Sequence, residues 1–197
     1  MVRDKVKSIN LLILKVFTIK SKELILNDGV KMINIRKSQK KDAKRMVEIN
    51  VETWKVAYRN LLPDEYLDNR NITEKRITEL ENKLKDNEVI SFVAEIDGQI
   101  VGFCNGGTSR DKDYPFEYEL CAIYVHPSFQ NKGVGQALFD AFKAKTQDCP
   151  FYLYALKGNM SAISFYIKNG GLEIPEYEKT IPIENVDVKE ILFAFQL

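Results

Sequence analysis

Two glycines, Gly133 and Gly135, lie in the stretch QNKGVGQ, where a strand-like run of apolar and aromatic residues gives way to an amphipathic helical pattern. Backbone amides at the start of a helix have no partner within it and carry the positive end of the helix dipole, so they bind anions. Glycines let a phosphate approach the main chain closely, and Lys132 adds a positive side chain. The stretch predicts a site for a phosphorylated ligand, with an ordinary helix-capping turn as the alternative.

Two common phosphate-binding motifs do not fit this stretch. The P-loop places its lysine after the last glycine and follows it with serine or threonine, whereas Lys132 precedes Gly133. The dinucleotide fingerprint needs three glycines and an acidic residue about 20 positions later, and no third glycine follows Gly135 in the expected helix. The sequence therefore argues against both kinds of nucleotide site.

A longer pattern surrounds the glycines. In YVHPSFQNKGVGQALF, a strand ending in V-x-P precedes Q/R-x-x-G-x-G/A, here residues 130–135. Further along, NMSAISFYIKNGG contains N-x-x-A-x-x-x-Y, with Asn159, Ala162 and Tyr166 at its fixed positions. Both patterns resemble motifs of the GNAT superfamily of N-acetyltransferases. The resemblance covers residues 33–197 in element order, and the two motifs together are more specific than either alone.

The resemblance implies that acetyl-CoA binds as co-substrate. The amides of residues 131–136 would bind the pyrophosphate. The strand edge around Ile123 and Val125 would pair with the pantetheine arm as an added strand would, with Asn159 on its other side. The cofactor-binding residues expected on this basis are Ile123, Tyr124, Val125, Gln130, Asn131, Lys132, Gly133, Val134, Gly135, Gln136 and Asn159.

The implied reaction is acyl transfer from a thioester to an amine. A neutral nitrogen attacks the carbonyl, an oxyanion forms and the CoA thiolate leaves, so the site needs a route for a proton and a donor at the oxyanion. By resemblance, the amide of Val125 polarises the carbonyl. The phenol of Tyr166 is the expected catalytic acid, with an ordinary pKa near 10. Simple packing, as for Phe165, is the alternative for Tyr166.

Glu119 is the expected catalytic base, acting directly or through water, because GNAT enzymes often carry a carboxylate in this strand. It has the same parity as Cys121, Ile123 and Val125, which predicts that all four side chains face one side of the sheet. Glu117 shares that parity and is the second candidate. A water chain without a protein base, or a solvated carboxylate without a role, are the alternatives.

The acceptor is expected to be a small-molecule or peptide amine. Its pocket is expected to include the first helix and the following loop, whose aromatic residues are candidates for the lining, with core packing as the alternative: Trp54, Tyr58 and Tyr66. Asp111 and Asp113 would attract a cationic acceptor, but solvated loop charge is the favoured interpretation. His126, the single histidine, is expected to be structural or surface-exposed. A non-catalytic acyl-CoA-binding or regulatory module is the alternative function, although Tyr166 and Glu119 favour an enzyme.

The elements that must position these residues follow from periodicity and turn signals. The sequence predicts strands and helices in the order β, α, α, β, β, β, α, β, α, β, hence an α/β fold with a mixed, mostly antiparallel sheet flanked by helices on both faces. Ser38 is the expected N-cap of the first helix. Asp97-Gly98 predicts a tight hairpin, a helix is expected over 134–145, and Gly170 ends the next helix. The last strand is expected over 188–197.

Composition limits the partners. With 29 basic and 28 acidic side chains in 197 residues, the net charge of +1 predicts neither nucleic-acid nor membrane binding. The three cysteines form no CxxC pair, which predicts reduced thiols in a cytoplasmic protein and no metal site. Residues 32–197 are expected to form one N-acetyltransferase domain, and residues 1–31 an N-terminal extension of unknown role. A homodimer is compatible with the sequence, but no feature predicts one.

Overall fold

The computed structural model describes residues 22–26, 29–147 and 149–196. Their strands are β1 (Lys22–Leu26), β2 (Gly29–Lys37), β3 (Ile90–Ile96), β4 (Gln99–Thr108), β5 (Tyr118–Val125), β6 (Phe151–Leu156), β7 (Leu172–Glu173), β8 (Lys179–Ile183) and β9 (Val186–Phe195). Their helices are α2 (Ala43–Ala57), α3 (Asp64–Asp68), α4 (Glu74–Lys83), α5 (Val134–Lys145) and α6 (Met160–Lys168), with short 3-10 turns η1 (Lys40–Asp42), η2 (Pro127–Phe129) and η3 (Pro175–Tyr177).

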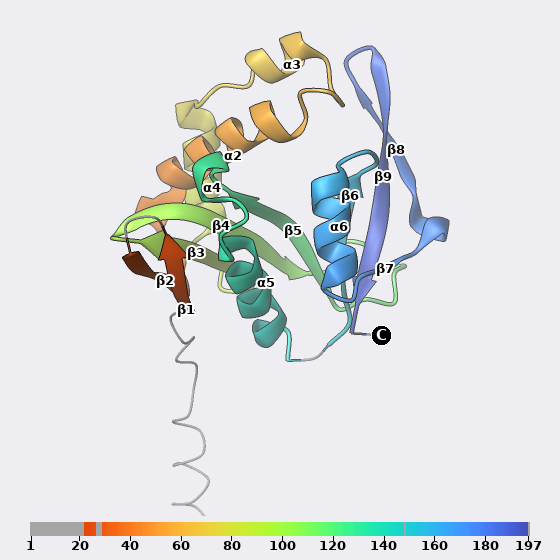
Figure 1. Ribbon diagram of the computed structural model, residues 1–197. Coiled ribbons are helices and arrows are strands. Elements are labelled where there is room, and N and C mark those ends of the chain that lie inside the picture. Colours follow the sequence, from red (N-terminus) through yellow and green to blue (C-terminus); the bar gives the residue numbers. More distant parts are fainter. Residues whose placement is uncertain (1–21, 27–28, 148, 197) are drawn as a thin grey trace, which may run out of the picture.

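These strands form one nine-stranded sheet in the order β1-β2-β3-β4-β5-β6-β9-β7, with β8 also paired to β9. All pairings are antiparallel except that of β5 with β6. Helices α2 and α4 cover one face, whereas α5 and α6 cover the other (Figure 1). The predicted fold class, a mostly antiparallel mixed sheet with helices on both faces, is confirmed.

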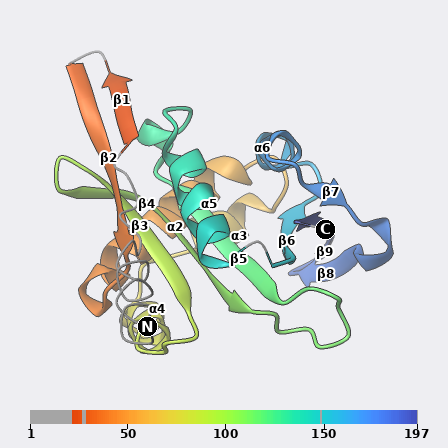
Figure 2. The same ribbon diagram turned by 90° about the horizontal axis from the view of Figure 1, so that it is seen from below.

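The sheet separates into two parts between β5 and β6. These strands are paired only at Tyr118 with Phe151 and at Glu119 with Tyr152. Beyond that point β5 continues to Val125 along β4, and β6 continues along β9. Figure 2 shows α5 over the first part and α6 over the second. The edge of β5 after Glu119 therefore has no neighbouring strand.

A β-bulge interrupts β5 just after this joint. Asn105 of β4 pairs with Ala122 and Gly106 pairs with Leu120, so Cys121 is an extra residue in β5. An extra residue shifts the alternation of side chains along the strand. Leu120 consequently packs in the same core cluster as Ile123 and Val125, under α5. Glu119 faces the other way, and the prediction that it shares a face with Ile123 and Val125 is wrong.

Local signals place several elements correctly. The hairpin at Asp97-Gly98 joins β3 to β4, with φ of 51° and 75° at its two residues, and α5 has the predicted bounds. Gly170 follows α6 with φ of 83°. The largest hydrophobic cluster lies between the sheet and these helices, and its aromatic members are Phe139, Phe142, Phe151, Tyr166, Phe193 and Phe195.

Ser38 does not cap the first helix. Its amide donates to the carbonyl of Ser91 at 2.9 Å, and its hydroxyl accepts from the hydroxyl of Ser91 at 2.8 Å. Gln39 instead precedes η1, and α2 follows from Ala43. The cap prediction is wrong because a cross-strand partner, distant in sequence, holds the serine against β3.

Three strands, β1, β7 and β8, are not predicted by the sequence patterns. Residues 22–26 form β1, which pairs with β2, and β2 begins at Gly29. Residues 29–31 of the predicted extension thus belong to β2, whereas residues 1–21 and 27–28 lie outside the described residues, so the role of the extension stays a prediction. The last strand, β9, spans 186–195 and pairs with β6 on one side and with β7 and β8 on the other.

Candidate active site

The glycine turn links the end of β5 to α5. Asn131 has φ of 59° and Gly133 has φ of 81°, so the chain turns through two left-handed residues. The first helical hydrogen bond runs from the amide of Ala137 to the carbonyl of Gly133 at 3.0 Å. The amides of residues 134–136 therefore have no acceptor in the helix and lie at its positive end. This geometry suits an anion held by main-chain donors.

Polar side chains of the turn hold its shape. Gln130 donates through Nε2 to the carbonyl of Val125 at 3.1 Å, which fixes the turn to the end of the strand. The ammonium of Lys132 donates to the carbonyl of Ser128 in η2 at 2.8 Å. Gln136 donates to Asn169, which follows α6, and so joins the two helices. These contacts leave the backbone amides as the groups available to a ligand.

Gly135 is not required by the packing of the protein. A Cβ atom built there would lie 3.8 Å from Val125 Cγ2 and 3.9 Å from Phe165 Cε2, which are ordinary contact distances. Its φ is not in the left-handed range. Glycine within a helix is less stable than alanine by roughly 0.5–1 kcal/mol. The residue thus costs stability without a structural need, which points to a requirement outside the fold.

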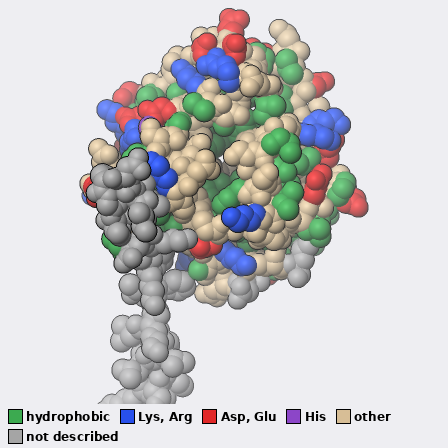
Figure 3. Space-filling model, viewed as in Figure 1, with side chains coloured by type: hydrophobic (Ala, Val, Ile, Leu, Met, Phe, Trp, Pro, Cys, Tyr) green, Lys and Arg blue, Asp and Glu red, His purple; other side chains and the backbone are tan. Residues whose placement is uncertain are grey.

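The gap between β5 and β6 receives side chains from both faces. Asn159 accepts from the amide of Ala162 at 3.2 Å and caps α6. Tyr124 accepts from the indole nitrogen of Trp54 at 2.9 Å. The phenols of Tyr58, Tyr124 and Tyr166 interact electrostatically with one another. In the view of Figure 3, which is that of Figure 1, hydrophobic side chains gather toward the centre of the molecule and most acidic side chains lie toward its rim.

Tyr166 is buried, with 7% of its surface exposed. Its ring packs at 5.8 Å from that of Phe193 and at 6.4 Å from that of Phe195. Burial, and secondarily the nearby phenol of Tyr124, raise the pKa of Tyr166 above its ordinary value. The phenol therefore stays protonated at neutral pH, as a proton donor must.

Glu119 is paired with Arg110. Its side chain is nearly fully buried, and the guanidinium binds both carboxylate oxygens, one of them from Nε at 2.7 Å. Burial alone would raise the pKa of Glu119, but the hydrogen bonds and charge of Arg110 outweigh it and hold the pKa below its ordinary value. Glu117 lies before β5 and is exposed; its backbone bonds to Ser109 and Pro150.

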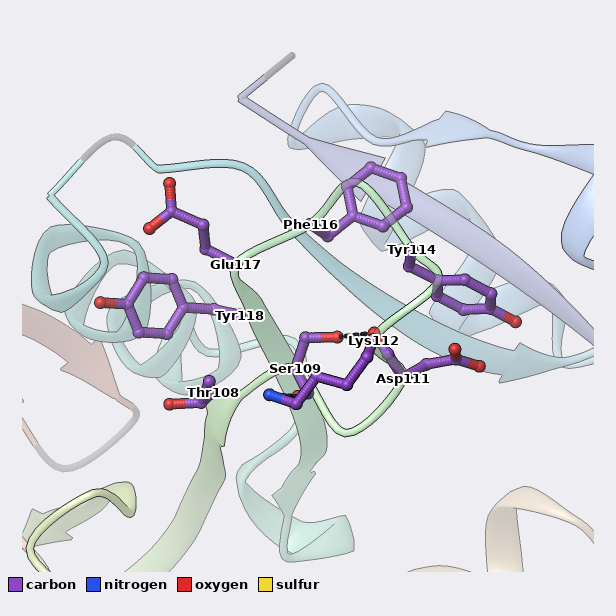
Figure 4. Close-up of a pocket in the computed structure, with 8 residues that line it drawn as sticks. All are labelled: Thr108, Ser109, Asp111, Lys112, Tyr114, Phe116, Glu117 and Tyr118. Carbon is purple, nitrogen blue, oxygen red and sulfur yellow. Dashed lines mark hydrogen bonds between the residues drawn. The ribbon is translucent and has the colours of Figure 1, made fainter.

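A cavity of about 490 Å³ lies beside Glu119, on the face opposite α5 and α6. Its lining residues are Arg110, Asp111, Lys112, Glu119, Tyr152, Tyr154, Lys179 and Glu190. A smaller cavity of about 250 Å³ lies beneath the 109–117 loop. In Figure 4 the carboxylate of Asp111 and the ring of Tyr114 point to one side of this loop, away from Glu117 and Tyr118.

Comparison with known proteins identifies the family. The sequence profile of the Acetyltransferase (GNAT) family matches residues 48–170. The chain belongs to the GNAT family. Among its GNAT relatives, the uncharacterized N-acetyltransferase YuaI of Bacillus subtilis is 30% identical over 109 residues, which are 54% of this chain and 60% of YuaI. Spermidine N(1)-acetyltransferase of Thermoplasma acidophilum is 26% identical over 145 residues, 70% of this chain and 87% of that enzyme.

Solved GNAT structures have the same fold. The PaiA N-acetyltransferase of Thermoplasma acidophilum, in complex with coenzyme A, is similar with a TM-score of 0.60 and 26% identity over 81% of this chain and 97% of that one. The structure of YncA of Salmonella typhimurium with acetyl-CoA has a TM-score of 0.64 at 18% identity over 84% of this chain and 94% of that one. The family match confirms the predicted N-acetyltransferase class, and these two neighbours hold coenzyme A and acetyl-CoA, respectively.

Other predicted residues of this GNAT chain have structural partners. His126 accepts through Nδ1 from the amide of Ser128 at 3.2 Å, and its Nε2 lies 3.0 Å from Glu52. It therefore stabilises the η2 turn, in agreement with its expected structural role. The aromatic residues expected at the acceptor pocket instead pack against a buried cluster that includes Leu62 and Leu156, as their alternative predicts: Trp54, Tyr58 and Tyr66. Asp113 is exposed.

Glu190 is one of the lining residues that the sequence analysis did not identify. It lies on β9 with the same parity as Val188, Leu192 and Ala194, which are buried. A charged residue at an inward-facing position of a strand is the signal that could have identified it.

In the part of this GNAT chain that the structure describes, every helix is too short or too polar to span a bilayer. Within the same ranges, no group of three or more histidine, cysteine or acidic side chains is arranged to hold a metal ion. The three cysteines form no disulfide.

Proposed function

We propose that the protein transfers the acetyl group of acetyl-CoA to a primary amine of a small molecule or peptide by direct attack on the thioester. The observation that carries this proposal is the continuity of two features. The free amides at the start of α5 lie at the end of β5, and β5 has an unpaired edge from Leu120 to Val125. A phosphate on the amides and an extended chain along that edge match the pyrophosphate and the pantetheine arm of acetyl-CoA.

The cofactor would use main-chain groups more than side chains. Its pyrophosphate would bind the amides of residues 134–136, with Gly135 giving space for close approach. Its pantetheine arm would run along β5 past Ile123, with the amide of Asn159 on the opposite wall. The carbonyl of Val125 already accepts hydrogen bonds from Thr53 and Gln130, so the amide of Val125 is the group left to polarise the thioester carbonyl.

The reaction needs one proton removed and one supplied. The amine nitrogen forms a bond to the thioester carbon and loses a proton, the carbon–sulfur bond breaks, and the thiolate takes a proton. Tyr166 is the proposed donor because its phenol is buried and protonated. Glu119 is the proposed acceptor of the amine proton, through water, since Arg110 keeps it ionised but covers both oxygens.

The pairing of Glu119 with Arg110 favours a second candidate function. A carboxylate held by a guanidinium at both oxygens is a weak base. A module that binds acyl-CoA without turnover would tolerate such a pair. In an enzyme, either the proton must pass Arg110 to reach Glu119 or the side chain of Arg110 must move away.

The similarity to a spermidine N(1)-acetyltransferase supports an aliphatic amine as acceptor. That relative is matched over 87% of its length. A protonated aliphatic amine is also compatible with the acidic and aromatic residues of the larger cavity, because carboxylates and tyrosine rings both attract ammonium groups.

Calorimetric titration with acetyl-CoA and with free CoA tests the cofactor site. The wild type is expected to bind both, and Gly135→Glu to bind neither, because the added carboxylate would occupy and repel the phosphate site. Gln99→Glu, which adds the same charge at an exposed position of β4, is the matched control and should bind normally. Absence of binding by the wild type would refute the proposal.

Turnover separates the two candidate functions. Thiol release from acetyl-CoA is measured with a panel of amines that includes spermidine, a monoamine and a peptide. Release that depends on an amine supports the enzyme. Binding of acetyl-CoA without release for any amine supports the non-catalytic module.

A further inference from the structure

The larger cavity and the glycine turn lie on opposite faces of the sheet. Glu119 and Tyr152, which form the last pair before β5 and β6 separate, both line the cavity. One end of the cavity therefore borders the gap between the strands. A thioester that enters along β5 from the α5 side and an amine in the cavity would meet at this gap.

The charged groups of the cavity are mostly paired with one another. Arg110 binds Glu119, and the ammonium of Lys179 lies 3.9 Å from a carboxylate oxygen of Asp111. The same ammonium lies 4.6 Å from the ring centre of Tyr154, over its face. These contacts occupy two cations and two anions of the lining.

Lys112 and Glu190 are the remaining charges. Lys112 is exposed and lies 3.4 Å from the carbonyl of Ser109, so water screens its ammonium. Glu190 is half-buried and makes no hydrogen bond or ion pair with the residues that the structure describes.

Position explains why Glu190 has no hydrogen-bond or ion-pair partner among the described residues. Lys179 lies directly opposite on β8, in register, but its ammonium is directed onto Asp111 and the tyrosine rings. Burial, opposed by the charges of Lys179 and Arg110, raises the pKa of Glu190 above its ordinary value. A half-buried carboxylate without a partner is unfavourable, and a cation bound beside it would relieve that cost.

Glu190 is too far from the gap to act on the reacting amine. It lies on β9, two strands away from β5, and pairs with Leu156, which is four residues along β6 from Tyr152. The rings of Tyr152 and Tyr154 line the cavity between the two positions. An alkyl chain packed on these rings would connect a reacting amine at the gap to a second ammonium at Glu190.

Resting on the proposed function, we infer that this cavity binds the acceptor and that Glu190 binds a second ammonium group, so the acceptor is a linear diamine or polyamine. Glu190 is then a specificity residue that distinguishes a diamine from a monoamine of equal length. Glu119 and Tyr166 keep their separate roles at the thioester.

The test compares putrescine, a four-carbon diamine, with butylamine, which lacks the second nitrogen. The wild type is expected to favour putrescine in kcat/KM by about tenfold or more, because hydrogen bonds to charged groups are among the stronger ones. Glu190→Gln is expected to raise KM for putrescine and to reduce the preference to about twofold, with KM for acetyl-CoA unchanged. If Glu190 had a merely structural role, Glu190→Gln would change kcat/KM equally for both amines.

Two variants control for charge and folding. Asp187→Asn removes an exposed carboxylate from the same strand and should leave the preference unchanged. Glu190→Asp keeps the charge and should retain part of the preference even if Glu190→Gln unfolds. Equal use of the two amines by the wild type, or an unchanged preference in folded Glu190→Gln, would overturn the inference while leaving amine acetylation intact.

If the wild type acetylates no amine, the proposed enzymatic function fails separately. The inference is then decided by calorimetric titration of spermidine into the CoA-bound protein. Saturable binding that Glu190→Gln loses would support the diamine site, and absence of binding would overturn it.

Discussion

Gly106 sits opposite the bulge in β5, and replacing it with alanine should distort the strand that carries Glu119. A Cβ atom at this position would lie 2.1 Å from the carbonyl oxygen of Glu119 and 2.7 Å from Cε2 of Phe142. A side-chain rotation cannot relieve a clash with backbone. Overpacked cores ordinarily lose about 1–3 kcal/mol, so we expect Gly106→Ala to lose about 3 kcal/mol of unfolding free energy. For a chain of this size that lowers Tm by about 6–12 °C.

Gly135→Ala is the matched control, since it makes the same chemical change but is expected to change the free energy of unfolding in the opposite direction. Its Cβ has room, so removing the freedom of glycine in the unfolded chain should stabilise the protein by about 0.4–1 kcal/mol. Thermal and denaturant unfolding of both variants without cofactor measure the difference. A Gly106→Ala protein within about 0.5 kcal/mol of the wild type would refute the reasoning from the bulge.

Three further predictions concern ionisable groups. Arg110→Gln leaves Glu119 buried without its cation, so its pKa should rise and the acid limb of the kcat/KM profile should move to higher pH; an unmoved limb would exclude Glu119 as the base. Tyr166→Phe should lower kcat by about 100-fold or more with acetyl-CoA affinity unchanged in calorimetry, and full activity would assign the phenol to packing alone. Asp42, buried and bonded to Arg36, has a pKa held below its ordinary value by that cation although burial opposes the shift. Its stabilisation is present above the unfolded pKa and lost as pH falls through the folded pKa. Asp42→Asn should therefore lower the free energy of unfolding by about 3 kcal/mol at neutral pH and make that free energy less dependent on acid pH. Equal dependence on acid pH in the wild type and the variant would contradict this assignment.

Elements specified by neighbouring residues could be predicted from the sequence. Asp97-Gly98 adopts the positive φ values that a tight hairpin needs, and the boundaries of α5 follow from Gly133 and the amphipathic run after it. Thr73 likewise begins α4, where its hydroxyl accepts from the amide of Arg76. In each case the information lies within a few residues of the structure that it determines.

Features that depend on distant strands could not be predicted. The extra residue Cys121 is visible only in the register with β4, and it reverses the face expected for Glu119. Arg110 pairs with Glu119 because the loop before β5 folds back, which residue spacing alone does not reveal. Ser38 fits a helix cap by type, yet its partner Ser91 comes from the neighbouring strand.

The joint between β5 and β6 has a mechanical consequence. Five strands on one side and four on the other are connected through the sheet by two residue pairs. The carbonyl of Pro150 reinforces this joint by accepting from the amides of Glu117 and Tyr118. The two parts of the sheet are therefore joined to each other through a single short stretch of strand pairing. Within the sheet, widening of the gap between β5 and β6 is resisted at this joint, and between the helices by the shared core and the hydrogen bond from Gln136 to Asn169.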